Sequence, residues 1–134
     1  MKIIKKVGVA CIKDNCLLLI KNKGISKYYL PVANCKDGEN DFDTLLREMR
    51  DKFEADIDFK SIRLIGTHQD KSPGIPACEE KTSYYCGQTI GTIRHRNDLE
   101  ELIWFDPRTS NFDDLSSIVK EKILPELFSK GMLN

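Results

Sequence analysis

The segment from Asp41 to Ala55 carries the clearest periodicity in the chain and constrains the fold most. Its apolar side chains recur at the spacing of one helical face, at Phe42, Leu45, Leu46, Met49 and Phe53. Charged residues fill most of the other positions, and Gly38-Glu39 comes directly before the segment. We therefore expect an amphipathic helix that follows a loop and packs one face against the rest of the domain.

The residues before this helix are rich in strand-forming side chains. Ile3–Ile12 and Cys16–Lys21 flank the polar residues Lys13-Asp14-Asn15, a pattern that predicts a β-hairpin. A third short run extends from Lys27 to Val32 and is halted by Pro31. In this half of the chain we therefore expect three strands, the first two paired.

After the helix the pattern predicts three more strands, over Ile57–His68, Thr82–Ile93 and Leu99–Phe105. Prolines and a glycine between Asp70 and Glu80 predict a loop. A second amphipathic helix is expected from Phe112 to Lys130, with a kink at Pro125, because proline lacks an N–H and crowds the preceding turn. This order of strands and helices predicts an α/β (α+β) domain over residues 1–134, with a mixed sheet and helices packed on it.

Composition narrows the function classes. The chain has 134 residues, 21 basic and 21 acidic, and a formal net charge of zero. A general nucleic-acid binder would carry a basic excess, so no nucleic-acid partner is expected. The apolar run before Lys13 is too short for a signal peptide. No stretch reaches the roughly 18 apolar residues that span a bilayer, so no membrane partner is expected. We expect a cytoplasmic location. The five cysteines include no Cys-x-x-Cys pair, which argues against a zinc site.

Acidic side chains cluster on the first predicted helix and in the loop before it. Glu48 and Asp51, at i and i+3, share one helical face, and Glu39 stands in the preceding loop. A rigid helix that presents carboxylates at fixed spacing suits Mg²⁺, because hard cations take oxygen ligands. The alternative is that these are ordinary surface charges on an amphipathic helix.

The segment from Ala33 to Ala55 resembles the Nudix box, Gly-x5-Glu-x7-Arg-Glu-U-x-Glu-Glu-x-Gly-U, in which U is aliphatic. Aligned without gaps, Glu39 takes the first glutamate position, Arg47-Glu48 the central pair and Met49 the aliphatic position. Other similarities lie outside the box, at Val7-Gly8-Val9, Tyr28-Tyr29-Leu30-Pro31 and Glu100–Phe105. The resemblance covers nearly the whole chain and implies a Nudix-like α/β/α sandwich with a kinked C-terminal helix.

The resemblance also implies a function. A MutT-like hydrolase of this family uses Mg²⁺ or Mn²⁺ to direct water onto the diphosphate of a nucleoside diphosphate linked to another moiety. It implies the metal ligands Glu39, Glu48 and Asp51. It implies the catalytic residues Glu48, Arg47 and a general base, Glu101 or alternatively Glu100. Arg47 would brace the loop by pairing with Glu39 or with backbone carbonyls, and a homodimer is one expected assembly. Substrate contacts are expected from Lys52, Tyr84 and Trp104, although core packing explains the two aromatic residues equally well.

The box departs from the family pattern at several positions. Ala33 replaces the opening glycine, with Val32 before it, and Lys36 stands where a glutamate is frequent. Asp51-Lys52 replaces the Glu-Glu pair, and Glu54-Ala55 replaces the final Gly-aliphatic pair.

Lys52 follows Glu48 at i+4, the favourable order for a helical ion pair, so we expect it to neutralise Glu48 instead of helping to bind metal. Two functions therefore remain open: a Nudix hydrolase with impaired or altered activity, or a catalytically inactive domain that binds a nucleotide or another partner.

Overall fold

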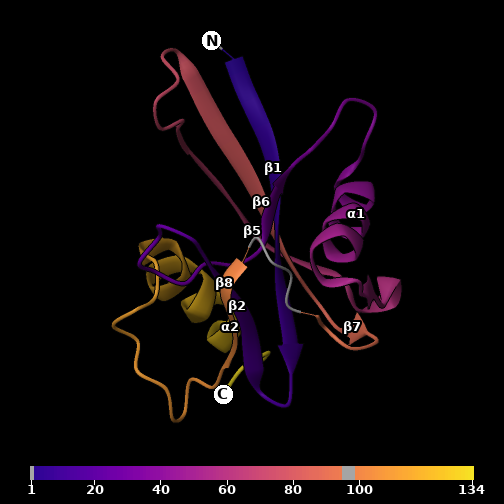
Figure 1. The fold of residues 1–134 in the computed structure, drawn as a ribbon, viewed down its shortest axis with the longest axis vertical. Helices are drawn as coiled ribbons and strands as arrows, with labels where there is room; N and C mark the ends of the chain where they lie inside the picture. The colour runs from indigo at the N-terminus through magenta and orange to yellow at the C-terminus, as the bar shows by residue number, and fades with distance from the viewer. Residues whose placement is uncertain (1, 95–98) are drawn as a thin grey trace.

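A mixed β-sheet forms the centre of the molecule (Figure 1). The computed structural model describes residues 2–94 and 99–134, without the side chains of Leu99 and Glu100. The main sheet has the order β5-β6-β1-β2-β8, and β3 also pairs with β1. Its strands are β1 (Lys2–Lys13), β2 (Cys16–Asn22), β3 (Val32–Asn34), β5 (Arg63–Lys71), β6 (Cys78–Gly87) and β8 (Leu99–Phe105). Only the β1–β6 pair within this sheet, as described, is parallel, so the expected mixed sheet is confirmed.

The predicted hairpin is formed by β1 and β2. Lys13 pairs with Cys16, so the turn consists of Asp14 and Asn15. Both turn residues have positive φ, 52° and 60°, which Asp and Asn tolerate better than most residues and which matches the twist of a tight hairpin. The Asn15 side chain also binds the backbone of Asn134, so the end of the chain is held against this turn.

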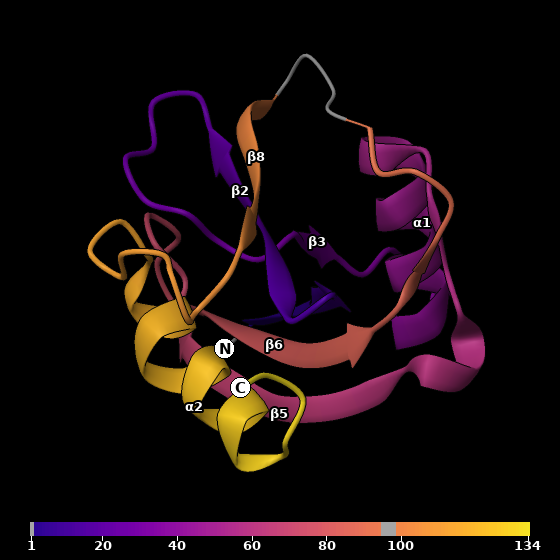
Figure 2. The same ribbon diagram turned by 90° about the horizontal axis from the view of Figure 1, so that it is seen from below.

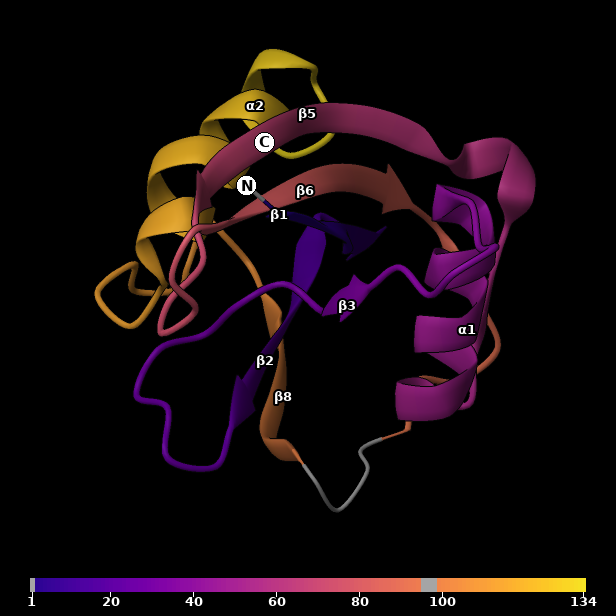
Figure 3. The ribbon, with the colours of Figure 1, turned by 90° about the horizontal axis from the view of Figure 1, so that it is seen from above.

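Helices cover both faces of the sheet, as Figures 2 and 3 show. Helix α1 (Asp41–Phe53) packs on one face through a core that includes Leu45, Met49 and Phe53. The C-terminal helix packs on the other face through a second core that includes Val119, Ile123, Leu124 and Leu127. Strand residues alternate between the two cores, as the period of a strand requires. The expected α/β/α sandwich is therefore present.

The C-terminal helix differs from its prediction at its start. It begins at residue 117 and not at Phe112, because Leu115 forms a bridge with Tyr28 and Ser116 N–H donates to the Tyr28 carbonyl. A π-helical turn over Val119–Ile123 leads into α2 (Leu124–Ser129), which contains Pro125. The wider turn accommodates the proline, whose ring would crowd a regular helix.

Other predicted boundaries were also wrong. The third strand was predicted over Lys27–Val32, but it begins after Pro31, where Val32 pairs with Gly8. Val32 and Ala33 are thus extended strand residues. The strand predicted over Ile57–His68 is broken between β4 (Asp56–Ile57) and β5 by a 3₁₀ turn at Phe59–Ser61, which Asp58 caps. The loop predicted over Asp70–Glu80 is shorter, because β5 extends to Lys71 and β6 begins at Cys78.

The strand predicted over Thr82–Ile93 is divided into β6 and β7 (Thr89–Ile90). Strand β7 pairs with β4 in a separate two-stranded sheet beside the end of α1. Among the described residues, no helix is long and apolar enough to cross a membrane.

Candidate functional site

Helix α1 is fixed at both ends by its own sequence. Asn40 caps its start: the Asn40 side chain accepts from Asp43 N–H at 2.8 Å, and the Asp43 side chain accepts from Asn40 N–H at 3.2 Å. The helix ends at Phe53 because Glu54 adopts a left-handed conformation with φ 52°, two residues before the predicted end at Ala55. These caps fix where the helix begins and ends.

The buried face of α1 is not the apolar stripe alone. Thr44 and Glu48 are buried beside Leu45 and Met49, whereas Phe42 is 36% exposed. The acidic face that the sequence predicted for Glu48 and Asp51 is therefore divided, because Glu48 is buried and Asp51 is exposed. The packed surface is rotated toward Thr44 and Glu48, so the Glu48 carboxylate lies inside the protein.

Arg47 binds Glu39 and braces the loop before the helix. Its Nε donates to Glu39 Oε2 at 2.8 Å, and its Nη2 donates to Glu39 Oε1 at 3.0 Å. The same Nη2 reaches the carbonyl of Asn34 at 2.9 Å, at the end of β3. Arg47 therefore ties the helix to the loop, in the way that the family resemblance implies.

Glu39 has little capacity left for another ligand. Besides Arg47, its Oε1 accepts from Lys36 N–H at 2.9 Å and lies 3.1 Å from the buried hydroxyl of Thr44. The bonds from Arg47 and then from Lys36 lower the pKa of Glu39 to about 2. Because two carboxylate oxygens offer about four lone-pair positions, most of them are used inside the protein.

Lys52 lies against the buried Glu48. Its Nζ is 2.7 Å from Glu48 Oε1, and the Glu48 side chain is only 6% exposed. That oxygen accepts no hydrogen bond from the described residues, so the contact is ionic without hydrogen-bond geometry. Asp51 follows one turn after Glu48 and is exposed. Of the three carboxylates predicted to hold metal, Glu48 is buried, Glu39 is half-buried and Asp51 is exposed.

This set of side chains does not fit a divalent cation. The described residues contain no group of three or more His, Cys, Asp or Glu side chains that could hold a metal ion. A Mg²⁺ ion bound to Glu48 Oε1 at about 2.1 Å would lie within roughly 4.8 Å of the Lys52 ammonium. At ~4 Å and an effective dielectric constant near 20, two positive unit charges repel each other by about 4 kcal/mol. The Lys52 ammonium therefore opposes the binding of a cation at Glu48.

The predicted base Glu101 is engaged on the other face of the sheet. It accepts a hydrogen bond from the hydroxyl of Tyr28, and its other oxygen lies 3.3 Å from Lys21 Nζ. These two partners lower the pKa of Glu101. Strand β8 alternates so that its neighbour Leu102 faces the α1 core, which leaves Glu101 on the opposite side from Glu48. The side chain of the alternative base, Glu100, lies outside the described residues.

Tyr84 and Trp104 are not brought together. Tyr84 belongs to the core under the C-terminal helix, where it also lines a cavity of about 410 Å³ beside β5. Trp104 is partly buried against the core under α1. The two rings therefore lie on opposite faces of the sheet. Lys21 and Tyr28 were not predicted as partners of Glu101, because only the folded sheet brings these three residues together.

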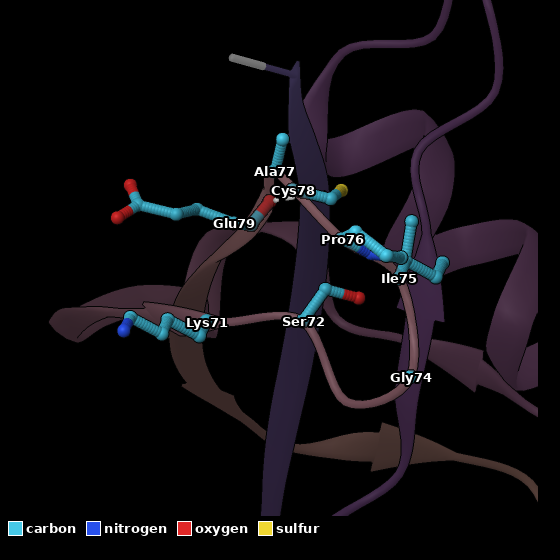
Figure 4. Close-up of a pocket in the computed structure, with 8 residues that line it drawn as sticks. All are labelled: Lys71, Ser72, Gly74, Ile75, Pro76, Ala77, Cys78 and Glu79. Atoms are coloured by element: carbon cyan, nitrogen blue, oxygen red, sulfur yellow. Dashed lines mark hydrogen bonds between the residues drawn. The ribbon is translucent and has the colours of Figure 1, made fainter.

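Another cavity lies at the β5–β6 loop (Figure 4). This loop lies away from α1 (Figure 1). It has a volume of about 580 Å³ and is lined by residues 71–72 and 74–79, several of them apolar. None of the residues predicted to bind metal or substrate lines it. We therefore treat the Glu39–Lys52 region of α1 and its loop as the candidate site.

No family model and no curated protein sequence matches this chain. Solved structures do. A NUDIX hydrolase from Nitrosomonas europaea superposes with a TM-score of 0.76 at 14% identity, over 96% of this chain and 90% of that one. A MutT NUDIX hydrolase from Burkholderia pseudomallei superposes with a TM-score of 0.70 at 20% identity, over 87% of this chain and 88% of that one. A UDP-X diphosphatase superposes with a TM-score of 0.74 at 17% identity, over 98% of this chain and 65% of that one.

At these identities the likeness concerns the fold, and it confirms the resemblance to the Nudix superfamily at that level. The chain has the fold of Nudix hydrolases. In this chain, helix α1 carries an ion pair between Lys52 and Glu48.

Proposed function

We propose that this chain is a Nudix-fold domain that binds a nucleoside diphosphate derivative without hydrolysing it. The observation that carries the proposal is the 2.7 Å contact between Lys52 Nζ and the buried Glu48. A hydrolase of this kind needs carboxylates that hold a divalent ion on the diphosphate. Here Glu48 is paired with Lys52, and Glu39 is paired with Arg47.

Two observations support the proposed binding of a nucleoside diphosphate derivative. The fold is that of proteins whose names include a UDP-X diphosphatase, so a nucleoside diphosphate is the ligand class that the fold suggests. The loop before α1 is also held by hydrogen bonds from Thr44 and Arg47 to Glu39 and from Arg47 to the carbonyl of Asn34. Of the two functions that the sequence left open, this geometry favours the inactive binding domain over the slowed hydrolase.

A hydrolysis assay tests the proposal. The native protein is incubated with Mg²⁺ or Mn²⁺ and a panel of UDP-sugars, ADP-sugars and nucleoside triphosphates, and the release of nucleotide or phosphate is measured. We expect no release above background from the native protein. A variant carrying Asp51→Glu and Lys52→Glu restores the glutamate pair and is the matched comparison. Turnover by the native protein that is lost in Glu48→Gln would overturn the proposal.

A further inference from the structure

Lys52 is a cation that is held in position by a buried carboxylate. Its side chain is 29% exposed, and its Nζ is 2.7 Å from a Glu48 carboxylate that is almost fully buried. The ammonium of Lys52 carries three N–H donors, and its contact with the single oxygen Glu48 Oε1 engages at most one of them. Within the described ranges, Glu48 is the only ion-pair partner of Lys52. At least two N–H groups of Lys52 therefore remain available to a ligand.

Resting on the function proposed above, we propose that Lys52 contacts the diphosphate of the ligand directly, so that binding does not require Mg²⁺. An ammonium group is an effective point-charge partner for phosphate. Pairing with a helix glutamate does not prevent this role, since protein kinases use a lysine–glutamate pair of this kind to place a lysine on nucleotide phosphates. Glu48 here restricts the rotamers of Lys52, so less conformational entropy is lost when a ligand binds.

Asp51 distinguishes this arrangement from a metal site. It is exposed, and it lies on the same helical face as Glu48, next to Lys52 in sequence. In a metal-assisted site Asp51 would hold the cation, so its removal would weaken binding of the diphosphate. In a metal-free site its charge repels the diphosphate, so its removal strengthens binding. The sign of the effect of Asp51→Asn therefore separates the two arrangements.

The test is calorimetric titration of the native protein with UDP, ADP and inorganic pyrophosphate, in EDTA and again in Mg²⁺. Uridine serves as the ligand that lacks phosphates. The variants are Lys52→Met, Asp51→Asn and, as a matched control, Lys130→Met, because Lys130 pairs with Glu126 at the same helical spacing on an exposed surface. The double variant Glu48→Gln/Lys52→Met provides a neutral pair if Lys52→Met alone does not fold.

We expect at least one of the three probes to bind equally well in EDTA and Mg²⁺. Lys52→Met, or the double variant, should weaken binding by roughly tenfold or more, since a hydrogen bond to a charged group is lost. Asp51→Asn should tighten binding, and Lys130→Met should leave it unchanged.

Binding that requires Mg²⁺, or that weakens in Asp51→Asn, would overturn the inference while leaving a nucleotide-binding domain in place. Binding of none of the probes would overturn the inference as well. Release of product during the titration would instead contradict the proposed lack of hydrolysis.

Discussion

Arg47 holds both carboxylate oxygens of Glu39, with contacts of 2.8 and 3.0 Å, and so fixes the loop before α1 to the middle of the helix. The first glutamate of the box therefore has a structural partner inside the protein. Its role in the fold can be measured separately from any function, because the pairing changes the proton affinity of Glu39.

Stability should depend on pH through Glu39. Its pKa is lowered from 4.5 to about 2 in the folded protein, first by Arg47 and then by Lys36 N–H. A carboxyl with a lowered folded pKa contributes stability above its unfolded pKa, and that contribution is lost as the pH falls from 4.5 toward 2. Urea unfolding should therefore show Glu39→Gln to be less stable than the native protein at neutral pH, with the difference shrinking below about pH 4.5.

Glu126→Gln is the control for this measurement, because Glu126 is an exposed partner of Lys130. Its difference from the native protein should stay small throughout the pH range. A Glu39→Gln difference that is constant from neutral pH down to pH ~3 would contradict the assigned role of the Arg47 pair.

The Lys52–Glu48 pair should also contribute to stability. Lys52→Met leaves the Glu48 carboxylate buried without its counter-ion, and we expect a loss of about 1–2 kcal/mol, between the values for exposed and buried pairs. The double variant Glu48→Gln/Lys52→Met should recover part of this loss, because no buried charge remains. Denaturant unfolding of the four proteins of this cycle gives the coupling energy. A coupling energy of zero, as expected for the exposed pair Lys130–Glu126, would show that Glu48 does not depend on Lys52.

Much of the fold could be predicted from local patterns. The hairpin turn at Asp14-Asn15, the α1 helix and the last strand at Leu99–Phe105 follow from turn chemistry and periodicity, and all three are present. The errors arose where tertiary contacts decide the structure. The C-terminal helix begins late because Leu115 and Ser116 pair with Tyr28, far away in the chain. No local pattern around Phe112 indicates that contact.

The candidate site was predictable to a similar extent. The spacing of Glu48 and Lys52 predicted an ion pair, and the structure contains it. Periodicity could not predict that Glu48 is buried, because this depends on how α1 is rotated against β1 and β3. The positions of Glu101, Tyr84 and Trp104 depend on which face of the sheet each strand residue occupies. The strand register and the alternation of side chains in the folded sheet decide which face each residue occupies, and local sequence patterns do not reveal the register.

Thiol reactivity should separate the five cysteines into two groups. Cys11, Cys78 and Cys86 are buried, whereas Cys16 and Cys35 are half-buried. Burial raises the pKa of Cys11 to about 12, so very little of the reactive thiolate forms near neutral pH. We expect a thiol-specific reagent to label Cys16 and Cys35 in the native protein and all five cysteines after unfolding. Mass spectrometry of the labelled peptides gives the assignment, and rapid labelling of Cys11 in the native protein would be inconsistent with the packing under α1.

We propose that Lys52 closes the metal position of this helix, and titration of Mn²⁺ into the native protein and into Lys52→Glu is the decisive test. We expect no saturable heat of binding for the native protein at millimolar Mn²⁺. We expect saturable binding for Lys52→Glu, in which three carboxylates share the face formed by Glu48, Asp51 and the new side chain. Binding of Mn²⁺ to the native protein as tightly as to Lys52→Glu would show that Lys52 does not exclude the metal.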